Sequence, residues 1–208
     1  MAGDITLVLL VITIAYLLGS IPSAYIVGRL LKGLDIREVG DGRMGAAAIF
    51  RRAGLAGGVI VGFMDLTKGA AAVLLAQYLG LPLPVVLLAA LAVVAGHNWS
   101  IFLRFTGGKG ALTMYGVLVS LMLWQFFIAL ALAGVAYLIT HKTGMSTGIL
   151  LGFLSLISWF TGSLILLSIL PVLISLPMVL KHIFMPKAGA AAMASIKTWG
   201  IKRDRDNK

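Results

Sequence analysis

The segment from Gly96 to Thr113 reads GHNWSIFLRFTGGKGALT and is a short polar interruption in an otherwise apolar sequence. Its tetrapeptide Gly107-Gly108-Lys109-Gly110 combines one lysine charge with three glycines, which let backbone N–H groups approach an anion closely. The run from Ala111 onward is typical of a helix, whose first N–H groups would point at the same anion. The segment therefore predicts a phosphate-sized site. The structural alternative is a glycine-rich turn whose lysine reaches the membrane surface.

The composition on either side of this segment places the chain in the membrane class. Its 208 residues are 60% hydrophobic and 12% charged, with a mean hydropathy of +1.05. There are no cysteines, so a disulfide framework or a cysteine-based metal site is excluded, and we expect neither metal nor cofactor. The net charge of +10 lies in loops between apolar spans, where the positive-inside rule explains most of it. No nucleic-acid partner is expected.

The basic residues indicate how often the chain crosses the membrane. Apart from Lys68, they form four clusters separated by apolar stretches, namely Arg29 to Arg52, Arg104 with Lys109, His141 with Lys142, and Lys181 to Lys208. If all four are cytoplasmic, each intervening stretch crosses twice. Adding a first helix over Ile5 to Val27 predicts an all-α integral membrane protein with seven transmembrane helices, one or two of them short. The N-terminus would lie outside and the C-terminus in the cytoplasm.

Turn residues predict where the paired helices break. The breaks are expected near Gly80 to Pro84, near Trp124-Gln125 and near Thr161-Gly162. The middle pair leaves each arm only about 15 residues, or about 22 Å, against a hydrocarbon core of about 30 Å, so one arm is not expected to span fully. Residues 1–185 then form a single polytopic domain and residues 186–208 a basic cytoplasmic tail.

Two further groups of charges lie near these helices. Asp65 and Lys68 are three residues apart on one helix face, where they can neutralise each other and should face the bundle. They form either a structural ion pair or a support beneath the phosphate site. The loop from Asp35 to Arg52 is a second glycine-rich basic segment, and arginine suits bidentate phosphate recognition. The alternative for this loop is contact with anionic lipid.

Residues spread in order along nearly the whole chain carry a resemblance to a known family. They are Tyr16 to Pro22, Asp35-Ile36-Arg37, Gly40, Gly42, Gly45, Ala46, Arg51, Asp65, Lys68, Gly69, Gly96-His97, Phe102, Phe105, Gly107 to Gly110 and Lys181-His182. In this spacing the sequence resembles the bacterial integral-membrane acyl-phosphate:glycerol-3-phosphate acyltransferases. The resemblance implies an enzyme at the cytoplasmic face of the bacterial cell membrane, with no metal or cofactor.

That family transfers a fatty acyl group from acyl phosphate to the sn-1 hydroxyl of glycerol 3-phosphate, which forms lysophosphatidic acid for phospholipid synthesis. The expected partners are both substrates, membrane lipid and, as a candidate, the enzyme that forms acyl phosphate. The candidate catalytic residues are Lys109, His97, Arg51 and His182, and the candidate phosphate-binding residues are Gly107, Gly108, Gly110, Gly42, Gly45, Arg43, Asp41 and Lys181. His97 would act as a base or orient a substrate; the alternative is a structural histidine, with the leaving phosphate taking the proton.

The sequence departs from the family pattern at several hydrogen-bonding positions. Asp41, Arg43, Ala47 and Ala48 replace a serine, an asparagine, a threonine and an asparagine of the first loop, Ser100 replaces a proline, and Met185 replaces an asparagine. Each lost hydrogen bond to a charged ligand would cost about 1.5–3 kcal/mol, and Asp41 would repel phosphate unless Arg43 paired with it. The alternative hypothesis is therefore a catalytically silent or substrate-shifted paralogue that binds anionic lipid or a partner enzyme. An anion transporter ranks last, because matched broken-helix repeats are lacking.

Overall fold

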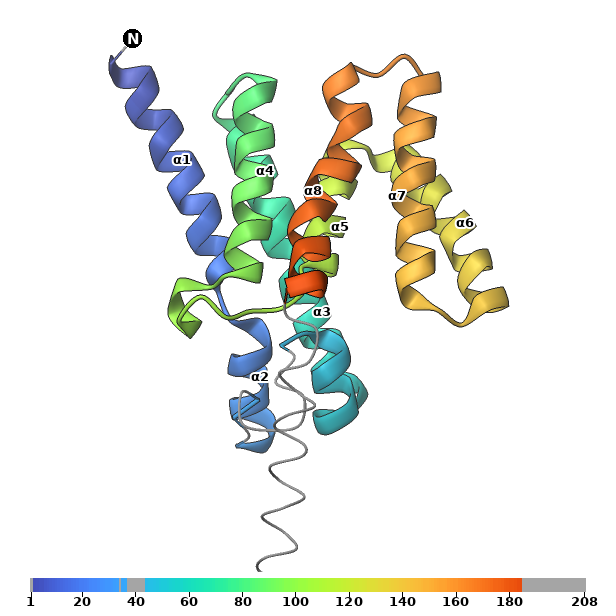
Figure 1. Ribbon diagram of the computed structural model, residues 1–208. Coiled ribbons are helices and arrows are strands. Elements are labelled where there is room, and N and C mark those ends of the chain that lie inside the picture. Colours follow the sequence, from blue (N-terminus) through green and yellow to red (C-terminus); the bar gives the residue numbers. More distant parts are fainter. Residues whose placement is uncertain (1, 34, 37–43, 185–208) are drawn as a thin grey trace, which may run out of the picture.

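The computed structural model describes residues 2–33, 35–36 and 44–184, so the predicted tail, 186–208, lies outside it. This part of the chain is a helical bundle with one short 3-10 turn, η1 (Ile101–Leu103), as Figure 1 shows. The α-helices are α1 (Ala2–Ser20), α2 (Ser23–Lys32), α3 (Ala46–Tyr78), α4 (Leu83–Asn98), α5 (Ala111–Leu121), α6 (Leu123–Thr140), α7 (Thr143–Phe160) and α8 (Ile165–Phe184). If α1 and α2 are counted as one interrupted helix, the described residues form seven helices.

Three helical segments are long and apolar enough to cross a membrane. They are Asp4–Lys32, Ala46–Tyr78 and Leu123–Thr140, and the remaining α-helices are shorter apolar ones. Many large hydrophobic side chains stay exposed on the outer faces of the bundle, which is expected where lipid is the solvent. The predicted all-α integral membrane architecture is therefore confirmed. The number of crossings and the orientation remain predictions.

The first predicted helix is not continuous. The expected span, Ile5 to Val27, is interrupted because α1 ends at Ser20 and α2 begins at Ser23. Pro22 has no N–H to donate, so the helical hydrogen-bond ladder is interrupted here, and the last carbonyls of this stretch have partners outside the helix. The Ile21 carbonyl accepts from Lys68 Nζ at 3.2 Å, and the Ser20 carbonyl accepts from Ser100 Oγ at 2.5 Å.

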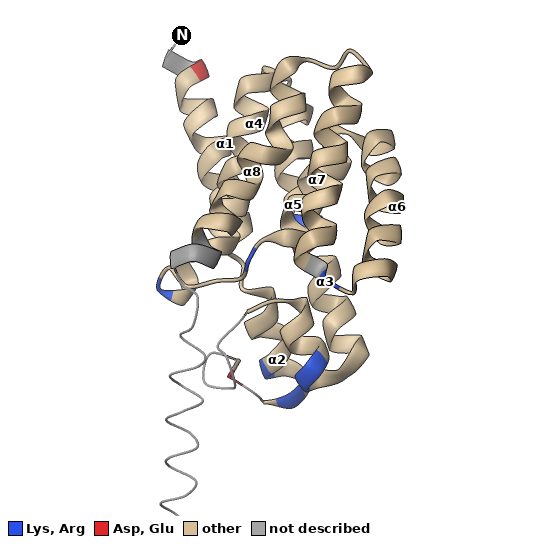
Figure 2. Ribbon diagram, turned by 45° about the vertical axis from the view of Figure 1, so that its right-hand side comes forward, with Lys and Arg blue, Asp and Glu red and all other residues tan. Residues whose placement is uncertain are grey.

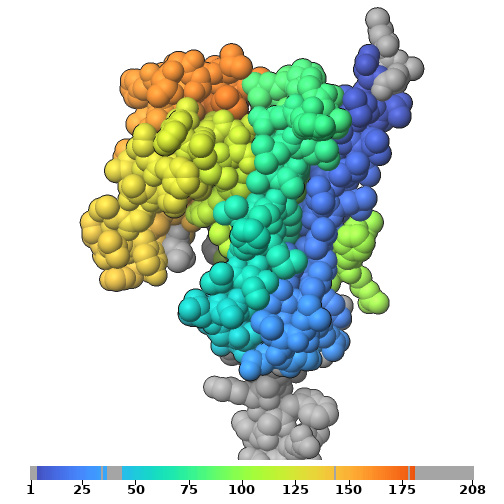
Figure 3. Space-filling view, turned by 180° about the vertical axis from the view of Figure 1, so that it is seen from behind, coloured from blue at the N-terminus to red at the C-terminus, as the bar shows by residue number. Residues whose placement is uncertain are grey.

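The loop before α3 is shorter than predicted. It was expected to reach Arg52, but α3 begins at Ala46 and carries Arg51 and Arg52 on its first turns. A glycine permits the local backbone, since Gly54 interrupts this helix with φ 83° and ψ −178°. The short first part of α3 lies against α2 at one end of the bundle, as Figure 3 shows from behind.

The predicted breaks near Gly80 to Pro84 and near Thr161-Gly162 are confirmed by the ends of α3, α4, α7 and α8. The middle break falls at Met122, slightly before the predicted Trp124-Gln125, and it makes α5 the short arm. With 11 residues, α5 is about 16 Å long and does not reach across a hydrocarbon core of about 30 Å. The expectation of one incomplete arm is confirmed.

Close helix packing fixes the ends of α4 and α5. A side chain at Gly96 would collide with the Tyr16 carbonyl of α1, and one at Gly116 would collide with the Leu66 carbonyl of α3. Glycine at these positions lets the backbones touch, as small residues do in membrane helix interfaces. The loop between α4 and α5 is therefore held at a fixed place against α1 and α3.

Candidate functional site

The loop between α4 and α5 folds back on the end of α4. Arg104 and Phe105 adopt left-handed backbone conformations, with φ 53° and 59°, which turn the chain after η1. Ser100 and Thr106 then form an isolated antiparallel bridge. Tyr16 of α1 secures the loop from outside, because its hydroxyl donates to the Trp99 carbonyl at 2.7 Å. The glycine-rich tetrapeptide that follows is thus held on a rigid support.

The glycines of the tetrapeptide pack against the end of α4. A side chain at Gly107 would collide with the His97 carbonyl, and one at Gly108 would collide with His97 Nε2 and the Met44 carbonyl. The Gly108 N–H donates to the His97 carbonyl at 3.1 Å. Phosphate binding by Gly108 therefore stays a prediction, and this hydrogen bond is the contact that its amide makes in the structure. Gly108 also lets three segments meet.

Two helices begin beside the glycine-rich tetrapeptide, Gly107 to Gly110. Gly110, with φ 80°, is the N-cap of α5, and Gly45 is the N-cap of α3, next to Met44. Helix N-termini carry a partial positive charge and unpaired N–H groups, which favours anions nearby. Lys109 lies between Gly108 and Gly110 with an exposed side chain. The structure therefore combines an exposed lysine with two helix N-termini.

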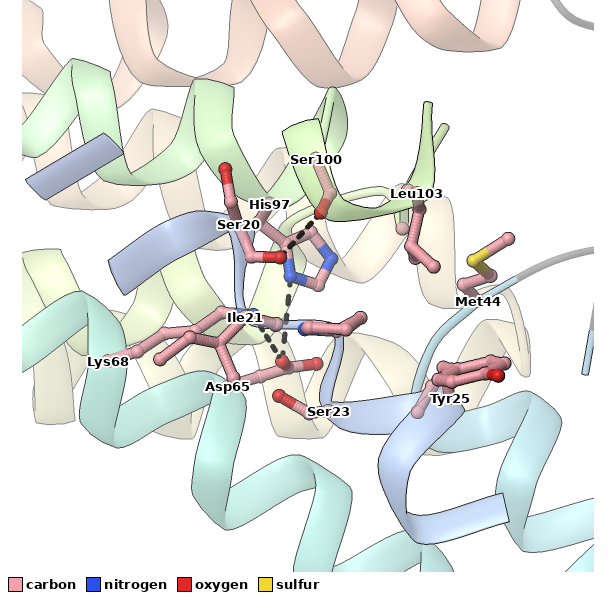
Figure 4. Close-up of a pocket in the computed structure, with 14 residues that line it drawn as sticks. Ser20, Ile21, Ser23, Tyr25, Met44, Asp65, Lys68, His97, Ser100 and Leu103 are labelled. Carbon is pink, nitrogen blue, oxygen red and sulfur yellow. Dashed lines mark hydrogen bonds and ion pairs between the residues drawn. The ribbon is translucent and has the colours of Figure 1, made fainter. Parts of the chain in front are cut away.

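A small pocket opens between the glycine-rich tetrapeptide and the α1–α2 break. Figure 4 shows the labelled side chains around it, which come from the α1–α2 break, α3, the end of α4 and the loop. Of the predicted site residues, the pocket lining includes His97, Gly107 and Gly108. Met44 also lines it, so the end of the first glycine-rich loop and the second glycine-rich loop do meet.

Three buried charged or titratable side chains lie at the inner end of the pocket. Lys68 Nζ is 2.8 Å from Asp65 Oδ1, and His97 Nδ1 is 3.5 Å from the same oxygen. Side-chain exposure is 6% for Lys68, 4% for Asp65 and 8% for His97. The predicted pairing of Asp65 with Lys68 is confirmed, and its contact with His97 is an addition that sequence spacing did not reveal.

The other predicted residues are placed less closely or lie outside the description. Arg51 is exposed on α3 and is not among the described residues that line the pocket. Lys181 and His182 lie in the last turn of α8, and their side chains are outside the described part. Asp41, Gly42 and Arg43 are outside the described residues altogether.

Sequence reasoning missed Ser20 and Ser23 as pocket residues. Both side chains are buried, and their hydroxyls have no hydrogen-bond partner among the described protein atoms. The sequence feature that could have indicated them is the polar segment Ser20-Ile21-Pro22-Ser23 inside an apolar run, where a proline interrupts the helix and two hydroxyls lie beside the break. Within the described part of the chain, no three His, Asp or Glu side chains gather in a way that could hold a metal ion.

This arrangement defines an integral membrane protein in which a glycine-rich loop with an exposed lysine lies beside a buried polar pocket. The family model described as Glycerol-3-phosphate acyltransferase matches residues 9–187, which is most of the chain. The chain belongs to the glycerol-3-phosphate acyltransferase family. The resemblance inferred from the motifs is therefore confirmed, and the chain is an enzyme of the acyltransferase class.

Individual relatives agree with the family match. Glycerol-3-phosphate acyltransferase 2 of Moorella thermoacetica is 50% identical over 127 residues, which are 59% of this chain and 65%, just under two thirds, of that protein. Glycerol-3-phosphate acyltransferase 1 of Dehalococcoides mccartyi is 44% identical over 153 residues, covering 71% of this chain and 74% of that protein.

Solved structures show the same fold. Two crystal structures of PlsY (YgiH), an integral membrane glycerol 3-phosphate acyltransferase, match with TM-scores of 0.76 and 0.71. One is its glycerol 3-phosphate form and the other its lysophosphatidic acid form. Each match is 28% identical and covers 84% of this chain, with 88% and 87% of the respective PlsY chains covered.

Proposed function

We propose that this acyltransferase moves a fatty acyl group from acyl phosphate to the sn-1 hydroxyl of glycerol 3-phosphate. The products are lysophosphatidic acid and inorganic phosphate. The observation that carries the proposal is the convergence of Lys109 with the N-termini of α3 and α5 beside a buried polar pocket. Both substrates carry phosphate, and the surrounding helices expose apolar faces to an acyl chain.

The reaction balances without a covalent enzyme intermediate. The sn-1 hydroxyl oxygen attacks the acyl carbonyl carbon, the bond between that carbon and the phosphate oxygen breaks, and phosphate leaves with the electron pair. The hydroxyl proton goes either to His97 Nε2 or to the departing phosphate. Because acyl phosphate is already an activated anhydride, positioning of the two substrates and stabilisation of negative charge supply most of the rate.

The individual roles follow from position. Lys109 and the first N–H groups of α5 hold a phosphate, and His97 presents Nε2 on the side of the ring that faces Gly108. Arg51, His182, Lys181, Gly42, Gly45, Arg43 and Asp41 are further candidates from the sequence. Arg51 would have to reach the substrate from the exposed first part of α3.

Two of the departures from the family pattern, Ser100 and Ala48, support an active enzyme. Ser100 donates from a buried position to the Ser20 carbonyl, so it secures the loop where the family has proline. Ala48 packs in an apolar cluster with Ile49 and Val61. These two replacements have packing roles of their own and add no unpaired group to the pocket, which argues against a silent paralogue.

A donor competition tests the proposal. The purified protein in lipid receives labelled glycerol 3-phosphate with palmitoyl phosphate, palmitoyl coenzyme A or palmitoyl acyl carrier protein. We expect lysophosphatidic acid only with palmitoyl phosphate, with one phosphate released per product. Equal product from a thioester donor would refute the proposed donor, and no product from folded protein would favour the silent paralogue.

We further propose that the chain crosses the membrane seven times. The N-terminus would then lie outside, and the glycine-rich loop before α5 would lie at the cytoplasmic face of the bacterial cell membrane. The support is charge distribution: most described Lys and Arg residues lie toward the α2 end, whereas Asp4 lies at the opposite end (Figure 2). Because the chain has no cysteines, single cysteines report directly on topology. Lys142→Cys should be labelled only from the cytoplasm and Ser163→Cys only from outside; the reverse pattern would overturn the orientation.

A further inference from the structure

The turn η1 and the two residues after it, 101–105, form a projecting segment on the side of the bundle, here called the η1 tip. Three of its large hydrophobic side chains stay exposed, Ile101 by 47%, Phe102 by 60% and Phe105 by 59%. Arg104 precedes Phe105 and is exposed as well. Figure 3 shows from behind that this segment extends sideways beside α1 and α2. The bundle itself therefore does not cover the apolar side chains of the tip.

The backbone holds the tip in an unusual conformation. Arg104 and Phe105 are successive non-glycine residues with left-handed φ values of 53° and 59°, which persist only where the surrounding structure enforces them. The Phe105 N–H donates to the Ser100 carbonyl at 2.8 Å, and the Thr106 N–H donates to the Leu103 carbonyl at 3.1 Å. Leu103 is buried in the apolar cluster that also contains residues of α2 and α3. The exposure of the two phenyl rings is therefore imposed by a rigid turn.

The tip lies next to a face of the bundle that meets lipid. The outer side of α1 exposes Leu9, Leu10 and Leu17, as expected for a helix that crosses a membrane. The turn η1 contacts α1, and Figure 1 places it near the end of α1 where α2 follows. The membrane surface around the bundle is thus continuous with the surface of the tip.

The chemistry of the tip favours an anionic lipid surface. Interfacial segments bury phenylalanine and leucine at the boundary between headgroups and acyl chains, while arginine extends its charge to the polar side. Among the described carboxylates, Asp4 lies at the opposite end of the bundle, and Asp35 and Asp65 are buried. In the described part of the chain, no exposed acid at this end opposes the approach of a lipid phosphate.

We infer that the η1 tip is an anchor on the membrane surface. Phe102 and Phe105 enter the headgroup region beside α1, and Arg104 contacts the phosphate of an anionic phospholipid. Because the chain continues directly from the tip into the glycine-rich loop, the anchor also sets the depth of Lys109 relative to the lipid. This kinetic consequence rests on the proposed function, whereas the lipid contact itself does not.

Spin-label depth measurements test the lipid contact. The chain has no cysteines, so Phe102→Cys carries a single nitroxide label in liposomes of phosphatidylcholine and phosphatidylglycerol. Its collisions with oxygen, which concentrates in the membrane, are compared with its collisions with a water-soluble nickel chelate. Leu9→Cys on the exposed side of α1 is the membrane control, and Lys32→Cys at the exposed end of α2 is the water control. We expect the ratio for Phe102→Cys to lie between these controls.

The role of Arg104 is tested by changing the lipid charge. Raising the phosphatidylglycerol content should lower nickel access to the label at Phe102, and added salt should weaken this effect. In the Arg104→Gln background, the dependence on phosphatidylglycerol should disappear. A ratio at Phe102 that does not respond to lipid charge would overturn the contact with anionic phospholipid.

Kinetics test the consequence for the glycine-rich loop. Phe102→Ser combined with Phe105→Ser removes both rings from exposed positions, so the thermal unfolding midpoint should not fall. We expect the KM for membrane-dissolved palmitoyl phosphate to rise about 3- to 10-fold, with kcat and the KM for water-soluble glycerol 3-phosphate within about twofold. An unchanged KM for palmitoyl phosphate would overturn the depth-setting role.

The remaining outcomes separate this inference from the proposed function. Nickel access at Phe102→Cys equal to that at Lys32→Cys would place the tip in water and overturn the anchor. Exclusion of both oxygen and nickel would also overturn it, because a protein partner or a second copy of the chain would then cover the tip. Absence of acyl transfer by folded wild type would remove the proposed function, whereas a membrane depth at Phe102 would still support the anchor.

Discussion

Replacing Gly108 with alanine is expected to disable the enzyme with a moderate loss of stability. The added methyl group would collide with His97 Nε2 and the Met44 carbonyl. Reaching an ordinary contact distance of about 3.5 Å requires these atoms and the loop to separate by more than about 1 Å. Neither neighbour is the free end of a flexible side chain, because His97 is held by Asp65 and the carbonyl belongs to the backbone.

The magnitude follows from these contacts. Overpacking of this kind costs about 1–3 kcal/mol of folding free energy, and a 1 Å misplacement of reacting groups costs about 10²-fold in rate. The assay measures kcat for acyl transfer from palmitoyl phosphate, alongside thermal unfolding. Gly134→Ala is the matched control, because an alanine methyl group there meets no other atom within 4 Å. It should keep full activity and equal or higher stability.

Activity of Gly108→Ala within about threefold of the control would refute the reasoning, because it would mean that the loop moves without consequence. Equal loss in both variants would also refute it, since the effect would then reflect alanine in place of glycine and not the contact with His97.

Three other predictions concern single residues: two make one hydrogen bond each, and the third has an unusual backbone conformation. Ser100→Ala leaves the buried Ser20 carbonyl without its donor and should lower the free energy of unfolding by about 1–3 kcal/mol in a denaturation series; an unchanged value would contradict the role of that hydrogen bond. Gly54→Ala forces a side chain into φ 83° and ψ −178° and should cost about 1–3 kcal/mol, although no atom lies near the new methyl group. Tyr16→Phe removes the hydroxyl that secures the Trp99 carbonyl and should raise hydrogen exchange in the loop that follows; unchanged exchange there would count against this anchor.

The two kinds of helix break illustrate what sequence alone can predict. Gly80 to Pro84 and Thr161-Gly162 combine turn residues with a change of direction between apolar runs, so both breaks were predictable. Proline alone is ambiguous, because Pro22 ends a helix here, whereas Pro171 lies inside α8. Distant partners also act at the Pro22 break, since Ser100 donates to the Ser20 carbonyl and Lys68 joins the Ser23 N–H at the Ile21 carbonyl.

The site divides in the same way. The three-residue spacing of Asp65 and Lys68 was enough to predict their pairing. The local tetrapeptide around Lys109 was enough to predict a glycine-rich loop with one lysine. The contact of Asp65 with His97 joins α3 to α4, and the contact of Gly108 with Met44 joins two loops, so both depend on helix packing that no local pattern encodes. The hydrogen bond from the Gly108 N–H to the His97 carbonyl also joins segments that no local pattern brings together, and phosphate binding by Gly108 stays a prediction.

The most direct test of the account is acyl transfer by the purified protein in lipid with palmitoyl phosphate and radiolabelled glycerol 3-phosphate. Wild type should form lysophosphatidic acid, and Lys109→Ala should lower kcat/KM by about 10- to 100-fold, because a charge-assisted phosphate contact contributes about 1.5–3 kcal/mol. Lys142→Ala, which removes another exposed lysine at the start of α7, should match wild type. Equal rates for the Lys109 variant and wild type would contradict a phosphate site at the glycine-rich loop.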